Sequence, residues 1–510
     1  MTKMNRRRFL EDTLFVAASG AALACGMGRA SSLLAQETQP PPANERMGVA
    51  IVGIGSRGGN HIAAFSSDSR TDILYLCEPD TKRWSESQLD KIAESQNGVR
   101  PKFISDMRDA FDDNAVDIVS CASTNHWHTL CGLWALQAGK HCYLEKPISH
   151  NMHEGFVIEA AAKKYGKVVQ TGTQCRSSKA IVEAVDFVRN GGIGEVNFAR
   201  GLCYKRRKAV GPKGEYAIPE GIDYDLWSGP APLLPLTRPG FHYDWHWQRE
   251  YGNGDLGNQG PHQTDIARWF LDVDRYPKTV LSYGGRLGYQ AEKNDEHYID
   301  AGDTANTEVS LYDYGGKCMV FETRGLDTPA LLRPNGNDPK KDGAKVGVIA
   351  YGTKGYMVQS TYTYCAAFDL EGNLLGEFTG GGNHYANFVD AVVANDPSQA
   401  NAPARVGALS AAVSHMGNIS YYLGEDNRVS PAEIEMALKA ITSLDDDGVT
   451  LARTVEHLET NKVDLEKYPL SLGQKLDFDP EKLVFAHPEA EKLASRAYRK
   501  GFVVPKPEEV

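Results

Sequence analysis

The sequence predicts an α/β protein whose first domain is built on a parallel sheet. Short apolar runs alternate with helical patterns between residues 47 and 171, which is typical of a parallel sheet with helices on both faces. A glycine-rich turn follows the first of these runs. Hydrophobic residues make up 41% of the 510 residues and charged residues 24%, which favours a core-forming protein over a disordered chain.

The order of elements in the first domain follows from the apolar runs and the helical patterns between them. Asn151 with Glu154 gives one helix a good start, and Gly139 and Gly166 suit helix ends. A βαβ order predicts right-handed crossovers in a parallel sheet. The expected strands are 49–52, 73–77, 102–104, 117–121, 141–144 and 167–170, and the expected helices are 60–67, 81–95, 107–112, 128–138 and 152–165.

The N-terminus has the layout of a secretory signal. Arg6-Arg7-Arg8-Phe9-Leu10 precedes a moderately apolar stretch at 13–27 and small residues near 30–35, which resembles a twin-arginine export signal. We expect a signal at 1–35, a linker at 36–46 and folded export to the periplasm. The apolar stretch is shorter than the ~20 residues of a membrane span, so no stable span is expected in the mature form. A lipid anchor at Cys25 is the alternative reading.

Charge and cysteine content exclude several classes of partner and site. A formal net charge of −11 disfavours nucleic acid and anionic membranes as partners. Nine cysteines are too few for a disulfide scaffold. Cys77, Cys121 and Cys142 lie in predicted central strands, so we expect buried thiols.

The first turn predicts an NAD site. It reads Gly53-Ile54-Gly55-Ser56-Arg57-Gly58 and lies between a predicted strand and a predicted helix. Glycines allow close approach of a pyrophosphate to the helix N-terminus. Glu78 ends the second strand, where a carboxylate accepts hydrogen bonds from ribose hydroxyls and repels the extra phosphate of NADP. Arg57 could instead accommodate that phosphate, and a glycine-rich structural turn is the simpler alternative.

Three further segments resemble the glucose–fructose oxidoreductase / inositol dehydrogenase / rhizopine-catabolism (Gfo/Idh/MocA) family. They read A-S-T-N-H-W-H at 122–128, A-G-K-H-C-Y-L-E-K-P at 138–147 and G-D-L-G-N-Q-G-P-H-Q-T-D at 254–265. The resemblance covers about residues 47–425. It is specific for the family and poorly specific for the substrate.

The resemblance implies a Rossmann domain at 47–171 and a substrate and oligomerisation domain at 172–425 with a large, open, mainly antiparallel sheet. Because an open sheet face must be covered, we expect a homo-oligomer, a dimer or tetramer. Residues 426–510 extend beyond the family length as helices and an irregular tail. The expected strands of the second domain are 196–204, 278–288, 305–313, 316–323, 346–350, 355–359 and 366–378, and the expected helices are 383–394 and 404–423.

The resemblance also implies catalytic roles for Lys146 and His262. A lysine beside the cofactor stabilises a developing alkoxide, and a histidine can remove the hydroxyl proton. A solvated lysine and a buried structural histidine are the simpler readings. Asn125, His128 and Glu145 correspond to family positions beside the cofactor.

One position departs from the family pattern. Asn258 stands where an aspartate often assists proton transfer, and an amide cannot accept a proton. Either His262 with Lys146 suffices, or Asp255, Asp265 or Asp244 supplies the step.

The aromatic segment at 241–247 (F-H-Y-D-W-H-W) is a candidate substrate contact. Tyr243, Asp244 and His246 combine stacking faces with hydrogen-bonding groups, although packing at a subunit contact is an alternative. His242 and His246 could share a metal, but no third ligand is evident, so no metal site is expected.

Two charged residues outside that segment complete the expected substrate site. Arg176 follows Gln174 after the last strand of the first domain. It either faces the cleft, where it could bind a hydroxyl or carboxylate, or forms a salt bridge that links the domains. Asp265 is expected to support the substrate site.

Three functions are consistent with these residues. The first is an exported oxidoreductase with tightly bound NAD that oxidises a sugar, polyol or glycoside hydroxyl. The second is an NAD-dependent glycosidase that works through transient oxidation and elimination, as in some exported relatives. The third is a non-catalytic sugar-binding protein, which the presence of Lys146 and His262 disfavours.

Overall fold

The computed structural model describes residues 46–510. The predicted signal at 1–35 and all but the last residue of the predicted linker therefore lie outside the described residues. None of the described helices is long and apolar enough to cross a membrane.

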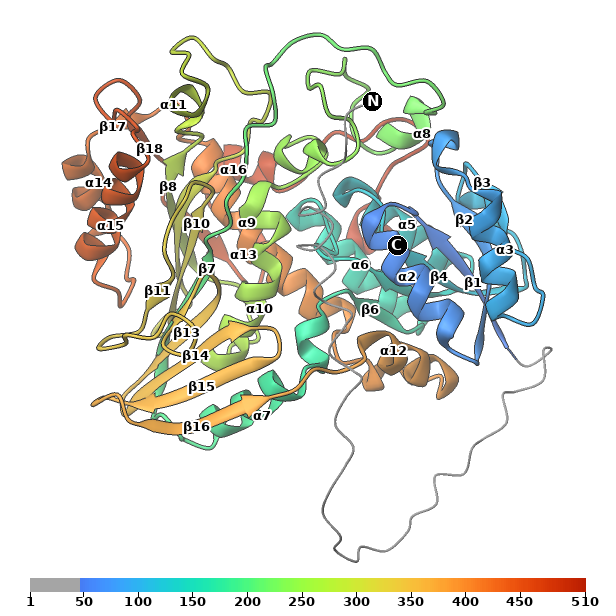
Figure 1. The fold of residues 1–510 in the computed structure, drawn as a ribbon, viewed down its shortest axis with the longest axis horizontal. Coiled ribbons are helices and arrows are strands. Elements are labelled where there is room, and N and C mark those ends of the chain that lie inside the picture. The colour runs from blue at the N-terminus through green and yellow to red at the C-terminus, as the bar shows by residue number, and fades with distance from the viewer. Residues whose placement is uncertain (1–45) are drawn as a thin grey trace, which may run out of the picture. The chain divides into compact units, whose positions relative to one another are not determined.

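The first domain is a Rossmann domain, as predicted. Its six strands form one sheet in the order β3-β2-β1-β4-β5-β6, and every neighbouring pair is parallel. Figure 1 shows this domain in blue and teal, with helices on both sides of the sheet. The strands are β1 (Met47–Val52), β2 (Thr71–Cys77), β3 (Lys102–Ile104), β4 (Val116–Cys121), β5 (His141–Leu144) and β6 (Val169–Thr171).

The helices of this domain follow the predicted order with one break. The predicted helix at 81–95 is a short 3₁₀ turn followed, after the extended residue Trp84, by a separate helix. Asn151 caps the last helix by accepting a hydrogen bond from the Glu154 backbone amide at 2.9 Å. The helices are α2 (Ser56–Ser67), α3 (Glu86–Ser95), α4 (Arg108–Phe111), α5 (His128–Gln137) and α6 (Met152–Tyr165).

The second domain is built on a twelve-stranded sheet. In it only β7 and β10 pair in parallel, so the sheet is mainly antiparallel, as the family resemblance implied. Its central strands are β7 (Val196–Cys203), β8 (Thr279–Gly285), β9 (Thr307–Asp313), β10 (Cys318–Arg324), β13 (Val346–Gly352), β14 (Gly355–Thr361), β15 (Tyr364–Asp369) and β16 (Leu374–Thr379). Residues 366–378, expected as one strand, are parts of the hairpin β15–β16, which turns at Gly372 with φ +96°.

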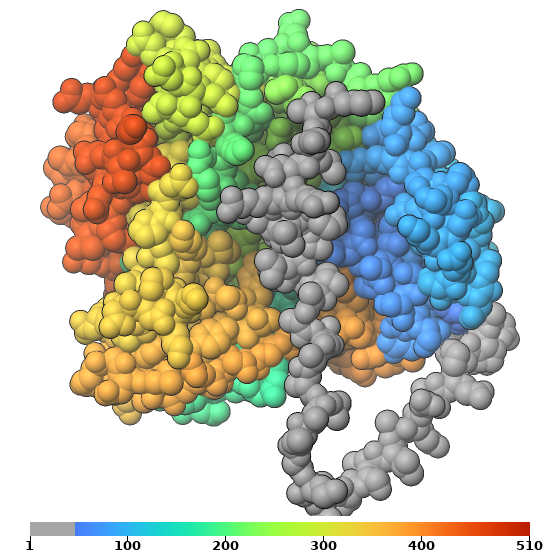
Figure 2. All heavy atoms as spheres, in the orientation of Figure 1, coloured from blue at the N-terminus to red at the C-terminus, as the bar shows by residue number. Residues whose placement is uncertain are grey.

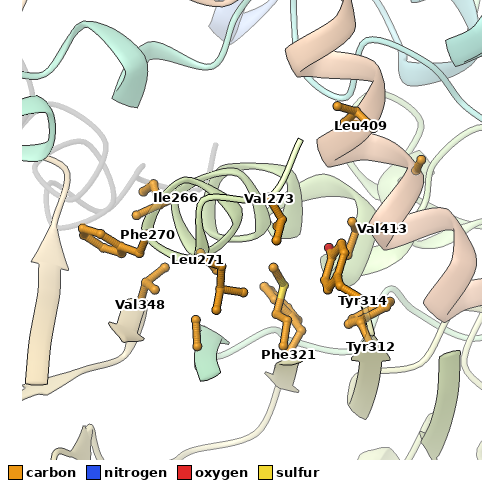
Figure 3. Close-up of a cluster of buried hydrophobic side chains, with 14 of the residues drawn as sticks. Ile266, Phe270, Leu271, Val273, Tyr312, Tyr314, Phe321, Val348, Leu409 and Val413 are labelled. Carbon is orange, nitrogen blue, oxygen red and sulfur yellow. The ribbon is translucent and has the colours of Figure 1, made fainter. Parts of the chain in front are cut away.

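Helices pack on the inner face of this sheet, between it and the Rossmann domain. These are α7 (Lys179–Arg189), α10 (Gly260–Leu271) and α13 (Ala404–Tyr422). In Figure 3, Ile266, Phe270 and Leu271 project from α10 beside the strand that carries Val348, and Leu409 and Val413 lie on α13. Because α10 carries residues of the 254–265 motif, this core holds that motif against the sheet.

The C-terminal extension covers the part of the opposite face that β7 to β10 form. Along β10, Met319 and Phe321 face the inner core, whereas Cys318 and Val320 face the extension, which is the alternation expected of a strand. The covering helices are α14 (Pro431–Leu438) and α15 (Asp447–Thr460), shown in orange-red in Figures 1 and 2. Each fully buried Leu or Ile in such a contact contributes about 1.5–3 kcal/mol.

Short strands of the extension also join the sheet. Strands β17 (Arg428–Val429) and β18 (Leu470–Leu472) continue it beyond β8, and β19 (Leu476–Asp479) pairs with β8 and β20 (Val484–Phe485). The extension, expected as helices and an irregular tail, is thus part of the second domain. It covers only the part of the outer face that β7 to β10 form, and the outer-facing residues of β13 to β15 form a separate cluster without residues of the extension. The expected homo-oligomer therefore stays a prediction.

The last residues of the chain return to the Rossmann domain. We call residues 488–510 the C-terminal strap. It begins with α16 (Pro488–Leu493), and Phe502 lies edge-on to Trp127 with ring centroids 5.6 Å apart. Farther along, His153 of α6 contacts the Pro505 carbonyl at 3.0 Å. The strap therefore connects the two domains near the residues described next.

Every cysteine among residues 46–510 is a buried free thiol, as expected for Cys77, Cys121 and Cys142.

Candidate active site

The glycine turn joins β1 to α2 with almost no room for side chains. Gly53 has φ +81°, and a Cβ there would lie 2.7 Å from the Ser123 backbone nitrogen. A Cβ on Gly58 would lie 2.0 Å from the Gly53 carbonyl oxygen, so Gly58 lets the first turn of α2 pack on the strand end. Gly53, Gly55 and Ser56 line the adjoining cavity, so the turn can present its backbone amides to a ligand there.

Glu78 lies against this turn at the end of β2. Its carboxylate accepts hydrogen bonds from the backbone amides of Ile54, at 3.4 Å, and Asp80, at 3.3 Å. Burial raises the pKa of Glu78, and Arg83 and these amides oppose that change. A Cβ on Gly55 would lie 2.7 Å from Arg83 Nη1, so this guanidinium adjoins the turn. A tight turn, a carboxylate and a guanidinium fit the phosphates and ribose of a dinucleotide.

Arg57, considered for a phosphate, forms an ion pair with Glu145. Its Nε lies 2.6 Å from Glu145 Oε1, and His61 Nε2 is 3.2 Å from the same oxygen. Burial alone would raise the pKa of Glu145, but Arg57, His61 and Lys146 outweigh it and hold the pKa well below its usual range. The Glu145 carboxylate therefore stays negatively charged where it lines the cavity beside Lys146.

Lys146 follows β5 and reaches across to the second domain. Its Nζ donates to the Asn258 backbone carbonyl at 2.8 Å and lies 3.3 Å from Asn258 Oδ1. Burial lowers the pKa of Lys146 to about 8; Glu145 opposes this, whereas Arg57, Lys205 and Arg207 add to it. The ammonium is thus held by neutral oxygens among other cations.

His262 lies on α10 and lines the same cavity. The side chain is buried, and its Nδ1 has no hydrogen-bond partner among the described residues. Burial, and next Lys146, hold the pKa of His262 well below 6.5. The ring is therefore neutral at pH 7 and able to accept a proton.

The acids considered as substitutes for the missing aspartate lie away from the cavity wall. Asp255 is buried under Arg207, which donates to it at 2.7–3.0 Å. Asp265 is fully buried and accepts two hydrogen bonds from Arg176, at 2.7 and 2.8 Å. Asp244 is likewise absent from the cavity lining. Arg176 therefore forms a salt bridge with Asp265, and because both residues lie within 172–425 this salt bridge does not link the two domains.

The segment 241–247 both packs and lines the cavity. Trp245 and Trp247 are buried, and His242, Tyr243, Trp245 and His246 line the cavity. His246 stacks on Trp245 with ring centroids 3.7 Å apart, and burial lowers its pKa to about 3. His242 lies 2.8 Å from Asp80 Oδ2. Among residues 46–510 no three His, Cys, Asp or Glu side chains are grouped to hold a metal.

Asn125 and His128 adjoin the Rossmann end of the cavity. Asn125 Nδ2 donates to Asn253 Oδ1 at 3.3 Å, which links the two domains. Both His128 ring nitrogens contact backbone carbonyls, those of Pro147 at 2.6 Å and Ser123 at 3.1 Å. Burial lowers the pKa of His128, and the contacts with these two carbonyls oppose that change.

A single cavity of about 540 Å³ brings most of the expected residues together. Gly58, Arg176, Asp244 and Asp265 are the expected residues that do not line it. Those that do are Gly53, Gly55, Ser56, Arg57, Glu78, Asn125, His128, Glu145, Lys146, Tyr243, His246, Asn258 and His262.

Several lining residues were not foreseen from the sequence. Lys205 and Arg207 follow β7, where a basic run at 205–208 after a predicted strand was the available signal. Trp127 and Trp227 form an aromatic wall, and Gln259 lies between Asn258 and α10. His61 does not line the cavity but contacts Glu145 from behind, and it had no signal in the sequence.

Comparisons with known proteins match both domains of the chain to one protein family. Residues 47–173 match the oxidoreductase family with an NAD-binding Rossmann fold (GFO_IDH_MocA), and residues 198–283 match the C-terminal α/β domain of the same oxidoreductase family. A solved structure of levoglucosan dehydrogenase in complex with NADH and levoglucosan has the same fold, with a TM-score of 0.51. It is 16% identical, and the match covers 73% of this chain and 96% of that one.

Curated relatives include dehydrogenases and glycosidases. Inositol 2-dehydrogenase of Salmonella paratyphi B is 28% identical over 34% of this chain and 51% of its own length. Levoglucosan dehydrogenase of Pseudarthrobacter phenanthrenivorans is 25% identical over 47% and 54%. A glycosyl hydrolase family 109 protein of Solibacter usitatus is 27% identical over 61% and 65%. The chain spans about half the length of the first of these relatives. With its Rossmann domain, its mixed second sheet and both family matches, the chain belongs to the Gfo/Idh/MocA family of NAD-binding oxidoreductases.

Proposed function

We propose that the protein is an NAD-dependent oxidoreductase acting on a hydroxyl of a sugar, polyol or glycoside. The observation that carries this proposal is the meeting of Lys146, Asn258 and His262 on one cavity wall continuous with the glycine turn. The glycine turn and Glu78 would hold the dinucleotide, and Asn125, His128 and Glu145 adjoin its reacting end. NAD, when bound, supplies the acceptor for the hydride.

Lys146 and His262 would have different roles at the substrate hydroxyl. Neutral His262 accepts the hydroxyl proton, and the Lys146 ammonium stabilises the negative charge that develops on that oxygen. The carbon bearing it gives up a hydride and becomes a carbonyl. The two oxygens of Asn258 hold the lysine in place and take no proton.

A glycosidase that works through transient oxidation is the second candidate. The match to a glycosyl hydrolase family 109 protein extends over 61% of this chain, more than the dehydrogenase matches described above. In that reaction a keto group acidifies the neighbouring C–H, elimination cleaves the glycosidic bond, water adds to the resulting enone, and the hydride returns to the keto carbon.

Product analysis separates these functions. The purified protein would be incubated with a library of glycosides and the products identified by mass spectrometry. A product lighter by two hydrogens with reduced cofactor supports oxidation, and a free aglycone without net reduction supports the glycosidase. Binding without any product would contradict both, and would support the non-catalytic sugar-binding alternative.

We also propose export by the twin-arginine route with the cofactor already loaded. Support comes from Arg6, Arg7 and the following Phe9-Leu10 in the sequence. Changing Arg6, Arg7 and Arg8 together to lysine should leave precursor in the cytoplasm, as fractionation and immunoblotting would reveal. Delivery of the triple variant to the periplasm at the normal rate would contradict the proposal.

The self-association expected from the sequence can be tested independently of the catalytic function. Light scattering during size-exclusion chromatography gives the mass of the assembly. A dimer or tetramer would require contacts other than the sheet face that α14 and α15 cover.

A further inference from the structure

Gln259 lines the cavity, and the proposed reaction gives it no role. It directly follows Asn258, which contacts Lys146, and it lies three residues before His262. The side chains of Asn258, Gln259 and His262 all belong to residues of the cavity wall. Gln259 therefore lies on the wall where the substrate hydroxyl would react.

The side-chain amide of Gln259 has a fixed orientation. Its Nε2 donates to the Tyr362 hydroxyl at 2.6 Å and to Gln263 Oε1 at 3.2 Å. These two contacts use both hydrogens of the amide nitrogen. Its Oε1 has no hydrogen-bond partner among residues 46–510, yet it is not fully buried. Because Gln259 lines the cavity, this oxygen offers a hydrogen-bond acceptor to a ligand there.

Tyr362 holds the amide of Gln259 from outside the cavity wall. It lies in the turn between β14 and β15, 103 positions later in the chain, and does not itself line the cavity. Its hydroxyl also accepts a hydrogen bond from Nε2 of the fully buried Gln263, at 3.4 Å. Burial raises the pKa of Tyr362, so the hydroxyl stays protonated. A side chain held in this way loses little conformational entropy when it binds a ligand.

An acceptor oxygen on this wall discriminates between substituents of a sugar. A hydroxyl donates a hydrogen bond to an amide oxygen, whereas a CH₂ group, an ether oxygen or a carboxylate does not. A ligand without a donor would displace water from Oε1 and leave that oxygen unpaired, at a cost in binding. The wall therefore favours a sugar with a hydroxyl at this place.

We propose that Gln259, positioned by Tyr362, accepts a hydrogen bond from a second hydroxyl of the substrate and so helps to determine which sugar is used. This inference rests on the proposed oxidoreductase function and adds a specificity-determining contact to the same site. The reacting hydroxyl would lie at Lys146 and His262, and the second hydroxyl would donate to Gln259 Oε1. Tyr362 is a positioning residue, because it acts through Gln259.

The test compares matched sugars and matched variants. NAD reduction would be measured with glucose and galactose and with the singly deoxygenated analogues of each. Gln259→Met keeps the length of the side chain and removes the amide, and Tyr362→Phe removes only the hydroxyl that holds the amide. Tyr364→Phe is the control, because it removes a hydroxyl that donates to Glu377 outside the cavity lining.

The expected result is a change in preference between a parent sugar and one deoxy analogue. Wild type should use that analogue about 10- to 100-fold less well than its parent, measured as kcat/KM. Gln259→Met should use the two sugars alike, since neither finds the acceptor. Tyr362→Phe should reduce the preference about 2- to 10-fold, and Tyr364→Phe should preserve it. The analogue that lacks the reacting hydroxyl is recognised separately, because none of the proteins oxidises it.

A purely structural role for Gln259 gives a different result. Loss of structure would lower kcat/KM for every sugar by the same factor and keep the wild-type preference in Gln259→Met. That outcome, or a wild type that prefers no parent sugar over any oxidisable analogue, would overturn the inference and leave the oxidoreductase proposal intact.

Isothermal titration separates failure of the contact from failure of the reaction. If no sugar reduces NAD, the same sugars would be titrated into the NAD-loaded proteins. Tighter binding of a parent sugar than of one deoxy analogue, seen in wild type and lost in Gln259→Met, would contradict the redox proposal and support the contact. Equal binding by wild type and Gln259→Met, including no binding by either, would refute the contact.

Discussion

Lys146 donates its shorter hydrogen bond to the main-chain carbonyl of Asn258, at 2.8 Å, rather than to the side chain. This contact joins the end of β5 in the Rossmann domain to the end of α9 (Gly254–Asn258) in the second domain. Because a backbone oxygen holds the ammonium, replacing the family aspartate by asparagine need not displace the lysine. The replacement removes a negative charge, and its consequences are therefore electrostatic.

The first prediction concerns the two groups at the reacting oxygen. Lys146→Ala and His262→Ala should each lower turnover about 10²–10⁴-fold while the protein keeps its fold and its NAD. Neither side chain adjoins the glycine turn, so nucleotide content should match wild type after extraction from denatured protein. Full activity in His262→Ala would exclude it as the essential base.

The second prediction concerns pH. The pKa of Lys146 is about 8, chiefly because of burial. A lysine is charged below its pKa, so stabilisation of an alkoxide should be lost as pH rises through about 8. The pKa of His262 is well below 6.5, so the base should remain neutral well into the acidic range. We expect kcat/KM to be flat through neutrality and to fall above pH 8. An increase through pH 8 would instead identify neutral lysine as the active form.

The third prediction concerns the effect of Asn258 on the charge of Lys146. Asn258→Asp restores the charge usual in the family, which should raise the pKa of Lys146 and move the alkaline limb of kcat/KM to higher pH. If Asn258 marks a specialised reaction, native turnover should not improve, and simple dehydrogenase activity could increase. Asn258→Ala is the matched control, because it keeps the backbone carbonyl and adds no charge. An alkaline limb that does not move would show that position 258 does not set the lysine charge.

Sequence patterns predicted the Rossmann domain well because its signals are local. Each strand there is a short apolar run next to a recognisable turn or helix cap. The break at Trp84 was missed because helical patterns on its two sides read as one helix. The β15–β16 turn was missed for a similar reason, since apolar residues flank Gly372 closely on both sides.

The extension shows what local patterns cannot reveal. Strands β17 to β20 have two to four residues and are stabilised by pairing with distant β8 and with each other. The pairing of Arg176 with Asp265 joins residues 89 positions apart, so neither could be assigned to a salt bridge from sequence alone. Motif residues at the site were identifiable because the family keeps their spacing, whereas Lys205 and Arg207 belong to no motif.

The fourth prediction concerns the choice of cofactor. Glu78 adjoins the glycine turn and is 6% exposed, so its carboxylate is held in place to meet ribose hydroxyls. The purified protein should release mainly NAD on denaturation. Glu78→Ala should weaken NAD binding about 10- to 100-fold and reduce discrimination against NADP. Glu86→Ala, at an exposed residue of α3 outside the cavity lining, removes the same charge and should bind NAD normally. Release of mainly NADP from wild type would contradict the assignment.

The last prediction concerns the C-terminal strap, which braces one wall of the cavity. Arg499 donates to the Gly229 carbonyl at 2.7 Å and to the Asp225 carbonyl at 2.8 Å, and its guanidinium lies 4.9 Å from the Phe502 ring. Phe502 packs on Trp127, whose indole nitrogen donates to the Leu226 carbonyl at 3.1 Å. The strap thus holds the segment around Leu226 against the Rossmann domain, and both Trp127 and Leu226 line the cavity.

Replacing Arg499 should therefore weaken the packing of that cavity wall while the protein stays folded. Arg499→Ala should lower the free energy of unfolding by about 1–3 kcal/mol, since it removes hydrogen bonds from a charged donor. It should also speed the release of bound NADH, measured by the change in dihydronicotinamide fluorescence after mixing with excess NAD. Lys500→Ala is the control, because Lys500 is the adjacent exposed cation. If Arg499→Ala lowers stability but leaves the release rate at the Lys500→Ala value, the strap stabilises the fold without retaining the cofactor.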